Sequence, residues 1–469
     1  MLHKDFIHIA KRLLRDGYDA FEAALDDEPT VSIRINPRKS DRSYSQQYEQ
    51  VPWCETGYYL PCRPSFTFDP LFHAGAYYVQ EASSMFLEQA VLTIPGATGQ
   101  TQRPVTALDL CAAPGGKSTH LSSILPDGSL LVSNEVVRNR SLILTGNMTK
   151  WGTSNTFITR NDPKAFSRMP HLFDIILADL PCSGEGMFRK DPAVRNEWSI
   201  DHVRLCAARQ RRIIHDVWEA LKPGGYLIYS TCTFNTEENE DNIKSLSVEL
   251  GAGIVPIPVK PEWNISGSSS HDMPVYRFFP HRLRGEGFFL ALMQKPVVGR
   301  SVSRYVHDRP GVGRSVSRYA LDPQISKMLS TPEKFVYTGA GVITAIRKAH
   351  ESVYTMLSGH VHMIAAGLIL GEQKGNDFTP SVALALSVEI DVEAFLNVDL
   401  SCEQAIAYLQ REAIVVPAST PKGYILVTFQ KTPLGFIKNT GIRANNLYPM
   451  AWRIKKDCRD AIHCITAIF

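Results

Sequence analysis

The sequence predicts an α/β fold, in which a doubly wound and mostly parallel sheet is flanked by an N-terminal accessory region and a C-terminal α+β domain. Between residues 105 and 294, short apolar segments alternate with helical stretches, as in a parallel sheet wrapped by helices. A glycine-rich turn follows the first apolar segment, and a cysteine follows each of two later ones. With 469 residues and 44% hydrophobic content, the chain is long enough for two or three domains.

Six buried strands are expected in the central part of the chain, at residues 105–110, 129–133, 156–159, 173–178, 226–230 and 288–293. Between Asp201 and Leu221, apolar residues recur near helical spacing, which predicts a helix before the fifth strand. The segment Lys222-Pro-Gly-Gly225 supplies a stop signal for that helix. This order of elements is typical of a Rossmann-like sheet.

The regions around the sheet are less regular. Residues 1–100 open with an amphipathic helix and form an accessory region, and residues 101–295 hold the sheet. Residues 296–324 contain a near-duplicate of Gly-Arg-Ser-Val-Ser-Arg-Tyr and form either a solvated linker or an arginine-rich strip that touches phosphates. Residues 325–469 alternate short strands, such as 424–429, with Gly and Pro turns, as in a small mixed α+β or barrel-like domain.

Composition restricts the class of protein. The formal net charge is +3 and the sequence pI is about 8.3, so a nucleic-acid partner is permitted but not required. Nine cysteines without a Cys-x-x-Cys pair argue against zinc and a disulfide framework, and favour a reducing cytoplasm. The charged N-terminus does not resemble a signal peptide, and the longest apolar stretch, around residues 363–370, is too short to cross a bilayer.

The turn from Cys111 to Lys117 reads Cys-Ala-Ala-Pro-Gly-Gly-Lys, and a helix begins near Ser118. Free backbone N–H groups at such a helix start point to a ligand. Glu135 ends the second strand, where it could accept both ribose hydroxyls, and Asp162 follows the third, where it could meet an adenine edge. Because Gly-x-Gly-x-x-Gly is absent from this turn, S-adenosylmethionine fits better than NAD.

The methionine carboxylate of this cofactor could bond the N–H groups at Gly115–Lys117, with a charge-assisted bond from Lys117. Taken singly, Lys117 could be a solvated lysine at a helix start, and Glu135 and Asp162 could be plain turn acids. Their joint placement at three strand ends favours the cofactor.

Cys182 in Asp179-Leu-Pro-Cys-Ser-Gly184 and Cys232 in Ser230-Thr-Cys-Thr233 each follow an expected strand, so both thiols should face one crevice. Methylation of carbon 5 of a pyrimidine first requires a nucleophile at carbon 6, and an activated thiolate suits that role. A second cysteine could assist release of the first. Sequence logic alone leaves open which thiol attacks.

A cysteine in such a position can also be a small buried hydrophobe. Cys111 is equally compatible with packing beside the turn, and Cys206, on the expected helix, belongs to the core. Asp179 is placed to bond the cytosine amino edge or the charged end of the cofactor. Amino-group methylases carry Asn/Asp-Pro-Pro-Tyr at this place, so Cys182 favours methylation of carbon.

On these motifs the chain resembles the NOL1/NOP2/Sun family of RNA 5-methylcytosine methyltransferases over residues 34–242. The resemblance implies a class I methyltransferase fold, with Cys232 as the nucleophile and Cys182 as the thiol that assists release. It also implies that S-adenosylmethionine is bound by the following residues: Cys111, Ala112, Ala113, Pro114, Gly115, Gly116, Lys117, Glu135, Asp162 and Asp179.

Residues 367–374, 433–439 and 445–449 resemble the C-terminal half of bacterial family members that methylate small-subunit rRNA. In that group a PUA-like RNA-binding module follows the catalytic domain, and the substrate is a cytosine in the decoding region of 16S rRNA. The duplicated Arg-rich segment and the tail after Ile454 are not matched, so the resemblance leaves linker geometry and the target base open.

The expected partner is RNA, as 16S rRNA or the small ribosomal subunit, and we expect a monomer without a metal or a membrane. Candidates for RNA contact are Arg34, Asn36, Arg189 and Lys190, each of which could equally be a solvated charge or a cap. The modest net charge favours recognition by shape and a flipped-out base.

The predicted activity is therefore S-adenosylmethionine-dependent methylation of cytosine carbon 5 in RNA through a covalent bond from Cys232 to carbon 6. Two alternatives with RNA are a tRNA cytosine-C5 methyltransferase and a non-catalytic ribosome-assembly factor. A third is a DNA cytosine methylase, in which Cys182 would attack instead.

Overall fold

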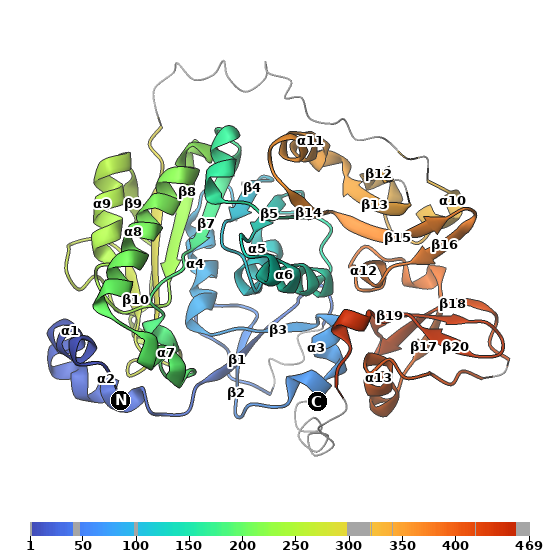
Figure 1. Ribbon diagram of the computed structural model, residues 1–469, viewed down its shortest axis with the longest axis horizontal. Coiled ribbons are helices and arrows are strands. Elements are labelled where there is room, and N and C mark those ends of the chain that lie inside the picture. Colours follow the sequence, from blue (N-terminus) through green and yellow to red (C-terminus); the bar gives the residue numbers. More distant parts are fainter. Residues whose placement is uncertain are drawn as a thin grey trace.

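The computed structural model describes residues 2–40, 47–97, 102–297, 319, 321–339, 341–417 and 419–455. A large central sheet lies between the N-terminal helices and two small C-terminal sheets (Figure 1). Most of the predicted Arg-rich linker, and the tail after Lys455, lie outside the described residues.

The central sheet has nine strands and contains all six that the sequence predicts. The predicted ones are β4 (Thr106–Asp109), β5 (Leu130–Asn134), β6 (Thr156–Thr159), β7 (Phe173–Asp179), β8 (Leu221–Thr231) and β11 (Phe288–Gln294). The order β8-β7-β4-β5-β6 is wholly parallel, whereas β11 and three further strands pair antiparallel at the sheet's two ends. These three are β9 (Gly253–Val255), β10 (Tyr276–Phe278) and β14 (Met363–Ala366).

Helices cover both faces of this sheet, which confirms the doubly wound fold. One face packs against α4 (Leu87–Thr93), α5 (Gly116–Ile124) and α6 (Arg138–Trp151). The other packs against η5 (Pro163–Arg168), α8 (Ile200–Val217), α9 (Glu240–Leu250) and α11 (Glu351–His360). Figure 1 shows α5 and α6 near the middle of the view, with α8 and α9 at the left.

The predicted end of α8 is too late. The helix ends at Val217 and passes through η7 (Trp218–Ala220), and β8 already begins at Leu221. Leu221 pairs with Phe173 of β7, and the ladder has an irregularity directly after this pair. The Pro-Gly-Gly segment is therefore part of the irregular start of β8, and not of the helix end.

The N-terminal region packs beneath the sheet. Its elements are α1 (Lys4–Leu14), η1 (Arg15–Gly17), α2 (Tyr18–Ala24), η3 (Phe66–Phe68), α3 (Pro70–Ala74), η4 (Ser83–Phe86) and the antiparallel strands β2 (Gly57–Leu60), β1 (Val31–Ile35) and β3 (Tyr77–Val79). The predicted amphipathic helix is confirmed as α1, whose Phe6 is buried against Phe188 and Trp198. Shorter helices join the central strands: η6 (Glu185–Met187), α7 (Pro192–Glu197) and η8 (Pro261–Trp263).

The C-terminal part forms two four-stranded sheets. The first has β12 (Phe335–Thr338), β13 (Val342–Arg347), β15 (Leu368–Lys374) and β16 (Asp377–Pro380); the second has β17 (Leu396–Asp399), β18 (Gly423–Phe429), β19 (Thr432–Asn439) and β20 (Ala444–Asn446). Their helices are α10 (Pro323–Ser326), η9 (Pro332–Lys334), η10 (Lys348–His350), α12 (Val382–Ala385), η11 (Val392–Ala394), α13 (Cys402–Leu409) and η12 (Met450–Trp452). The second sheet shares a core with the N-terminal strands. Within the ranges that the structure describes, we find no helix with the length and apolarity of a membrane span.

Candidate active site

The two cysteines that follow neighbouring strands meet at the carboxyl edge of the central sheet. Cys182 follows β7 and Cys232 follows β8, and the two strands pair in parallel, as predicted. The two Sγ atoms lie 3.2 Å apart, and the backbone N–H of Cys232 lies 3.4 Å from Sγ of Cys182. Both are free thiols and only half-buried, so the pair can be reached from outside.

The surroundings of Cys182 favour its protonated form. Its hydrogen bond with Cys232, then burial, and then the charges of Cys232 and Glu238 raise the pKa of Cys182 well above its ordinary value. This direction favours Cys182 as the S–H donor and Cys232 as the acceptor in the pair.

Glu185 ties the two cysteine loops together. It lies just after the Cys182 loop, and its Oε2 accepts the backbone N–H groups of Phe234 (2.7 Å) and Asn235 (2.9 Å), which follow Cys232. The backbone N–H of Gly186 donates to the carbonyl of Cys232 at 2.9 Å. Since Glu185 is buried, these contacts hold the loops at a fixed separation.

A second buried carboxyl, Glu238, supports the same junction from α9's side. It accepts hydrogen bonds from the N–H of Ser183 (3.0 Å), from Gln210 Nε2 (2.7 Å) and from Asn235 Nδ2 (2.8 Å). Burial raises the pKa of Glu238 to about 7, although these hydrogen bonds oppose the shift. Glu185 and Glu238 were not predicted from the sequence, because their partners are distant in the chain.

The glycine-rich turn forms the predicted helix start. Gly115 is the N-cap of α5 and has φ of 116°, a left-handed conformation that glycine adopts without strain. Its N-cap position leaves the first N–H groups of α5 without helical partners, as a ligand site of this kind requires. Ala112 and Ala113 are buried behind the turn, and Pro114 is exposed.

Lys117 pairs with Asp179, and its predicted bond to the carboxylate of the cofactor stays a prediction. The distance from Nζ to Oδ2 is 2.9 Å, and Ser230 Oγ donates to the other oxygen of Asp179 at 2.7 Å. Burial lowers the pKa of Lys117, but the charge and hydrogen bond of Asp179 and the charge of Cys232 outweigh it, so the pKa of Lys117 lies above its ordinary value. Lys117 therefore stays cationic near the cysteine pair.

Glu135 and Asp162 lie at the ends of the neighbouring strands β5 and β6, at the same edge of the sheet. Glu135 is buried; its Oε1 accepts the N–H of Val137, and its Oε2 has no hydrogen-bond partner and lies 3.3 Å from Nη1 of Arg140. Asp162 is exposed and accepts the N–H of Lys164 at 3.0 Å. Their roles in cofactor binding remain predictions.

Asp109, at the end of β4, is a site residue that the sequence analysis missed. It is fully buried; Oδ2 accepts from Ser118 Oγ at 2.6 Å, and Oδ1 has no partner. Burial raises the pKa of Asp109 to about 7, which the nearby carboxylates of Asp179 and Glu135 reinforce and the Ser118 bond and Lys117 oppose. Its place directly before the turn was a usable sequence signal.

This shift gives a pH-dependent stability. In the unfolded chain an Asp releases its proton near pH 4, whereas folded Asp109 keeps it up to about pH 7, so stability falls as the pH rises between these values, by up to about 1.4 kcal/mol per pH unit. We expect Asp109→Asn to make the slope of unfolding free energy against pH from 5 to 7 more positive than that of the parent, by up to about 1.4 kcal/mol per pH unit, measured by denaturant titration of the protein without ligand. The same change at exposed Asp201 should leave the slope as it is. Parallel curves for Asp109→Asn and the parent would contradict the assignment.

Three of the four predicted RNA contacts are corrected by the structure. Arg34 is fully buried and donates to Gln80 Oε1 (2.8 Å) and Thr119 Oγ1 (2.6 Å). Asn36 is also buried, and its amide donates to the carbonyls of residues 75 and 151. These side chains join the N-terminal strands to α5 and α6, so their role is internal.

Arg189 is buried as well, against Glu286. Its Nε donates to the carboxylate at 2.9 Å, and its Nη2 donates to the carbonyl of Gly285 at 2.8 Å. The side chain of Lys190 is partly exposed, and its Nζ lies 3.7 Å from the same carboxylate. Of the four candidates, only Lys190 has a side chain that solvent or RNA can reach.

One further prediction concerns a cysteine of the core. Cys206 is buried on α8, as expected.

Cys54, Glu88 and His120 form a buried cluster in which a metal could be held, a grouping that the sequence did not indicate. Hydrogen bonds already connect them, since Glu88 Oε2 accepts from Cys54 Sγ (3.2 Å) and lies 3.0 Å from His120 Nε2. The absence of a metal stays a prediction.

Three family models match successive parts of the chain. The model of the 16S rRNA methyltransferase RsmB/F family matches residues 99–294, that of the N-terminal domain of 16S rRNA methyltransferase RsmF matches residues 2–82, and that of the methyltransferase RsmF PUA domain matches residues 395–454. The PUA match thus covers the second C-terminal sheet and not the first.

Similar proteins extend over nearly the whole chain. Ribosomal RNA small subunit methyltransferase F of Escherichia coli O127:H6 is 30% identical over 464 residues, 92% of either chain. The protein of the same name from Cronobacter sakazakii is 30% identical over 472 residues, which cover 96% of this chain and 95% of that one.

Solved structures are similar over the central part. A methyltransferase homolog protein from Pyrococcus horikoshii has 26% identity and a TM-score of 0.53 over 62% of this chain and 95% of that one. NSun6 from Pyrococcus horikoshii with SFG has 20% identity and a TM-score of 0.52, which supports the fold alone. The full-length similarity shows that this chain belongs to the ribosomal RNA small subunit methyltransferase F family, within the NOL1/NOP2/Sun methyltransferases.

Proposed function

We propose that the protein transfers a methyl group from S-adenosylmethionine to carbon 5 of a cytosine in 16S rRNA, through a covalent bond between Cys232 and carbon 6. The observation that carries this proposal is the pair of free thiols 3.2 Å apart beside the glycine-rich helix start. A methylation of nitrogen would need no thiol here. The similarity to 16S rRNA methyltransferases supports RNA of the small subunit as the substrate.

The residues around the turn fit the cofactor. Asp109 Oδ1 is a buried acceptor without a hydrogen-bond partner, and such a group is costly unless a ligand completes it. Glu135 Oε2 has an ion pair with Arg140 but no hydrogen bond, so it can still accept one. S-adenosylmethionine offers donors of the required kind in its ammonium group and ribose hydroxyls. The helix start at Gly115 would hold its carboxylate.

Lys117 supplies a charge that can activate the nucleophile. A thiolate is the reactive form of cysteine, and a nearby cation favours it. Lys117 stays protonated through Asp179, and the charge of Cys232 contributes to the raised pKa of Lys117, which places the two groups in mutual electrostatic range. The S–H of Cys182 adds a hydrogen bond to the same sulfur.

The chain's own steps then follow. The Cys232 thiolate forms a bond to carbon 6, and an electron pair moves onto carbon 5, which takes up the methyl group. S-adenosylmethionine supplies that methyl group from its sulfonium. Once Cys232 is bonded to carbon 6, Cys182 releases its own proton to solvent and, as a thiolate, takes the proton from carbon 5. The double bond re-forms, and the carbon–sulfur bond breaks with its electron pair returning to Cys232.

The proposal is tested by incubating the protein and labelled S-adenosylmethionine with small ribosomal subunits, free 16S rRNA, tRNA or DNA. We expect label in the small-subunit substrates, and bisulfite sequencing should place it on carbon 5 of specific cytosines. Label on an exocyclic amino group, or on tRNA or DNA alone, would overturn the proposal.

A further inference from the structure

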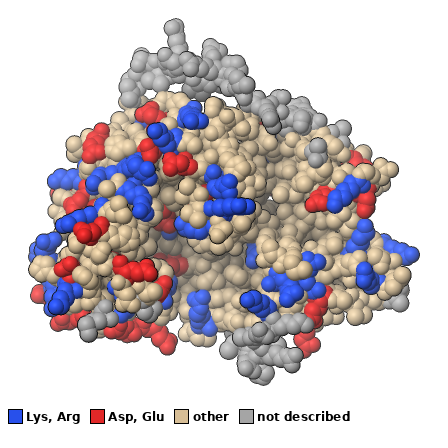
Figure 2. Space-filling model, viewed as in Figure 1, with Lys and Arg blue, Asp and Glu red and all other residues tan. Residues whose placement is uncertain are grey.

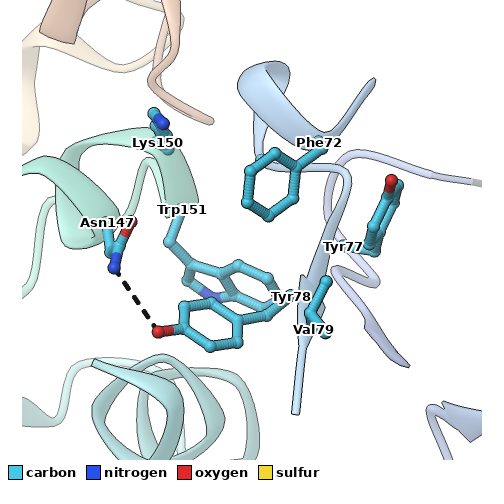
Figure 3. A pocket seen from close by; sticks show the side chains of 8 residues that line it. Phe72, Tyr77, Tyr78, Val79, Asn147, Lys150 and Trp151 are labelled. Carbon is cyan, nitrogen blue, oxygen red and sulfur yellow. Dashed lines mark hydrogen bonds between the residues drawn. The ribbon is translucent and has the colours of Figure 1, made fainter. Parts of the chain in front are cut away.

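A cavity of about 130 Å³ lies between the N-terminal region and α6, behind the glycine-rich turn. It is lined from α3 and the turn after it, from β3 and from the last turns of α6 by Phe72, Gly75, Tyr77, Tyr78, Val79, Asn147, Lys150 and Trp151 (Figure 3). Four of these eight residues carry aromatic rings. Neither the cysteine pair nor the groups assigned to the cofactor belong to it.

The aromatic walls are held in place by contacts outside the cavity. Trp151 donates from Nε1 to Ser123 Oγ at 3.1 Å, and the guanidinium of Arg34 lies 4.5 Å from the Trp151 ring centroid. The ring of Phe72 lies 5.9 Å from that of Tyr77. Figure 3 shows the rings of Phe72, Tyr78 and Trp151 around a common space. Rings fixed in this way can stack on a planar group without first being ordered.

Lys150 brings an unneutralised charge to this cavity. Its ammonium lies 5.5 Å from the ring centroid of Phe72 and 5.4 Å from that of Trp452, and no carboxylate pairs with it in the part of the chain that the structure describes. Burial lowers the pKa of Lys150 to about 8. A lysine that lines the cavity without a paired acid favours an anion.

The cavity adjoins the cofactor turn through shared residues. Asn147 Nδ2 donates to the carbonyl of Pro114 at 2.8 Å and to the hydroxyl of Tyr78 at 3.4 Å. A Cβ placed on Gly116 would meet Tyr78 Cε1 at 3.3 Å, so the ring packs on the turn itself. On this face of the molecule Lys and Arg gather over α6, and the surface is hollowed beside that helix (Figure 2).

We propose that this cavity binds an unpaired base of the RNA substrate, stacked against the partly exposed rings of Phe72 and Tyr78, with the adjoining phosphate on Lys150. The other two rings, Tyr77 and Trp151, are buried behind them. The aromatic rings recognise the planar face of a base, and the lysine takes the phosphate. Asn147 Oδ1 offers an acceptor, whereas its Nδ2 is already bonded to Pro114 and Tyr78. This inference rests on the proposed function for the identity of RNA as the substrate. It adds a second anchor, which would hold the strand next to the cysteine pair.

The test measures RNA binding without methyl transfer. Fluorescence anisotropy of a labelled single-stranded RNA of the target region is followed across a salt series without cofactor, for the parent, Lys150→Ala, Phe72→Leu and the control Lys244→Ala on exposed α9 surface. We expect about tenfold weaker binding for Lys150→Ala, with the slope of log K against log salt reduced by about 0.7. Phe72→Leu should weaken binding by about as much and keep the slope, because it removes stacking and no charge.

Lys244→Ala should behave as the parent, and thermal unfolding should show that all variants fold. Parent-like affinity and slope for Lys150→Ala, or parent-like affinity for Phe72→Leu, would overturn the inference. The inference would also be overturned if free AMP bound in the cavity while Lys150→Ala and Phe72→Leu left RNA binding unchanged. If the variants show the expected effects on binding but the protein methylates no RNA, the proposed function is wrong and the inference of an RNA-binding cavity is retained.

Discussion

Cys232→Ser lowers the rate of methyl transfer by at least about 10³-fold, because the alcohol cannot supply the nucleophile that carbon 6 requires. The side chain lies at the end of β8, within reach of the cation of Lys117 and the S–H of Cys182, and serine keeps the shape of the site. A hydroxyl remains protonated in this environment, so carbon 5 gains no electron density. The measurement is single-turnover transfer of a labelled methyl group to small-subunit RNA.

Cofactor affinity separates this effect from a structural one. The acceptors proposed to bind the cofactor belong to Asp109 and Glu135, and not to Cys232. Titration of Cys232→Ser with S-adenosylmethionine should therefore give the parent dissociation constant. The matched control is Cys62→Ser, at an exposed thiol, which should keep full activity. Retention of the parent rate by Cys232→Ser would exclude this sulfur as the nucleophile.

The fold was predictable because its strands are apolar segments that differ from their surroundings. All six predicted strands occur, since β4 to β8 and β11 are buried along most of their length and their sequences need only that pattern. The meeting of Cys182 and Cys232 follows from parallel pairing of β7 with β8, which places two strand ends at one edge. Local pattern and sheet geometry were sufficient for these features.

Three of the four predicted RNA contacts were wrong because burial of a polar or charged side chain depends on partners that are distant in the chain. Arg34 was expected at the surface, but Gln80 and Thr119, 46 and 85 positions away, satisfy its guanidinium inside the protein. Glu185 and Glu238 were missed for the same reason, since their partners come from several loops. No spacing rule in one sequence relates such residues.

The strand β14 shows a third kind of limit. Residues 363–366 follow the predicted start of the C-terminal region, yet they pair with β6 and complete the central sheet. Pairing at a sheet edge depends on how the whole chain returns to that edge, and an apolar run of this length fits either sheet. The aromatic cavity could not be predicted from the sequence for the same reason, because its walls come from two distant segments, residues 72–79 and 147–151.

Cys182→Ala should trap the protein on its RNA and lower turnover by about 10²- to 10⁴-fold, the range that a lost acid–base group gives. Before attack, the hydrogen bond and charge of Cys232 are among the causes that raise the pKa of Cys182. Once the sulfur of Cys232 is bonded to carbon 6, it is uncharged and no longer accepts the hydrogen bond from Cys182. Cys182 then loses its own proton more readily, and the resulting thiolate can take the proton from carbon 5. Alanine cannot, and the bond to Cys232 persists.

The trapped species should appear as a band of lower mobility that survives denaturation and contains both protein and RNA. It should require S-adenosylmethionine, because the proton becomes removable only after carbon 5 has gained its methyl group. The double variant Cys182→Ala, Cys232→Ala should give no such band, which separates a bond through Cys232 from general cross-linking. Normal turnover by Cys182→Ala without a trapped species would mean that water or another group removes the proton, and that the 3.2 Å contact of the two sulfurs serves only to hold Cys232 for attack.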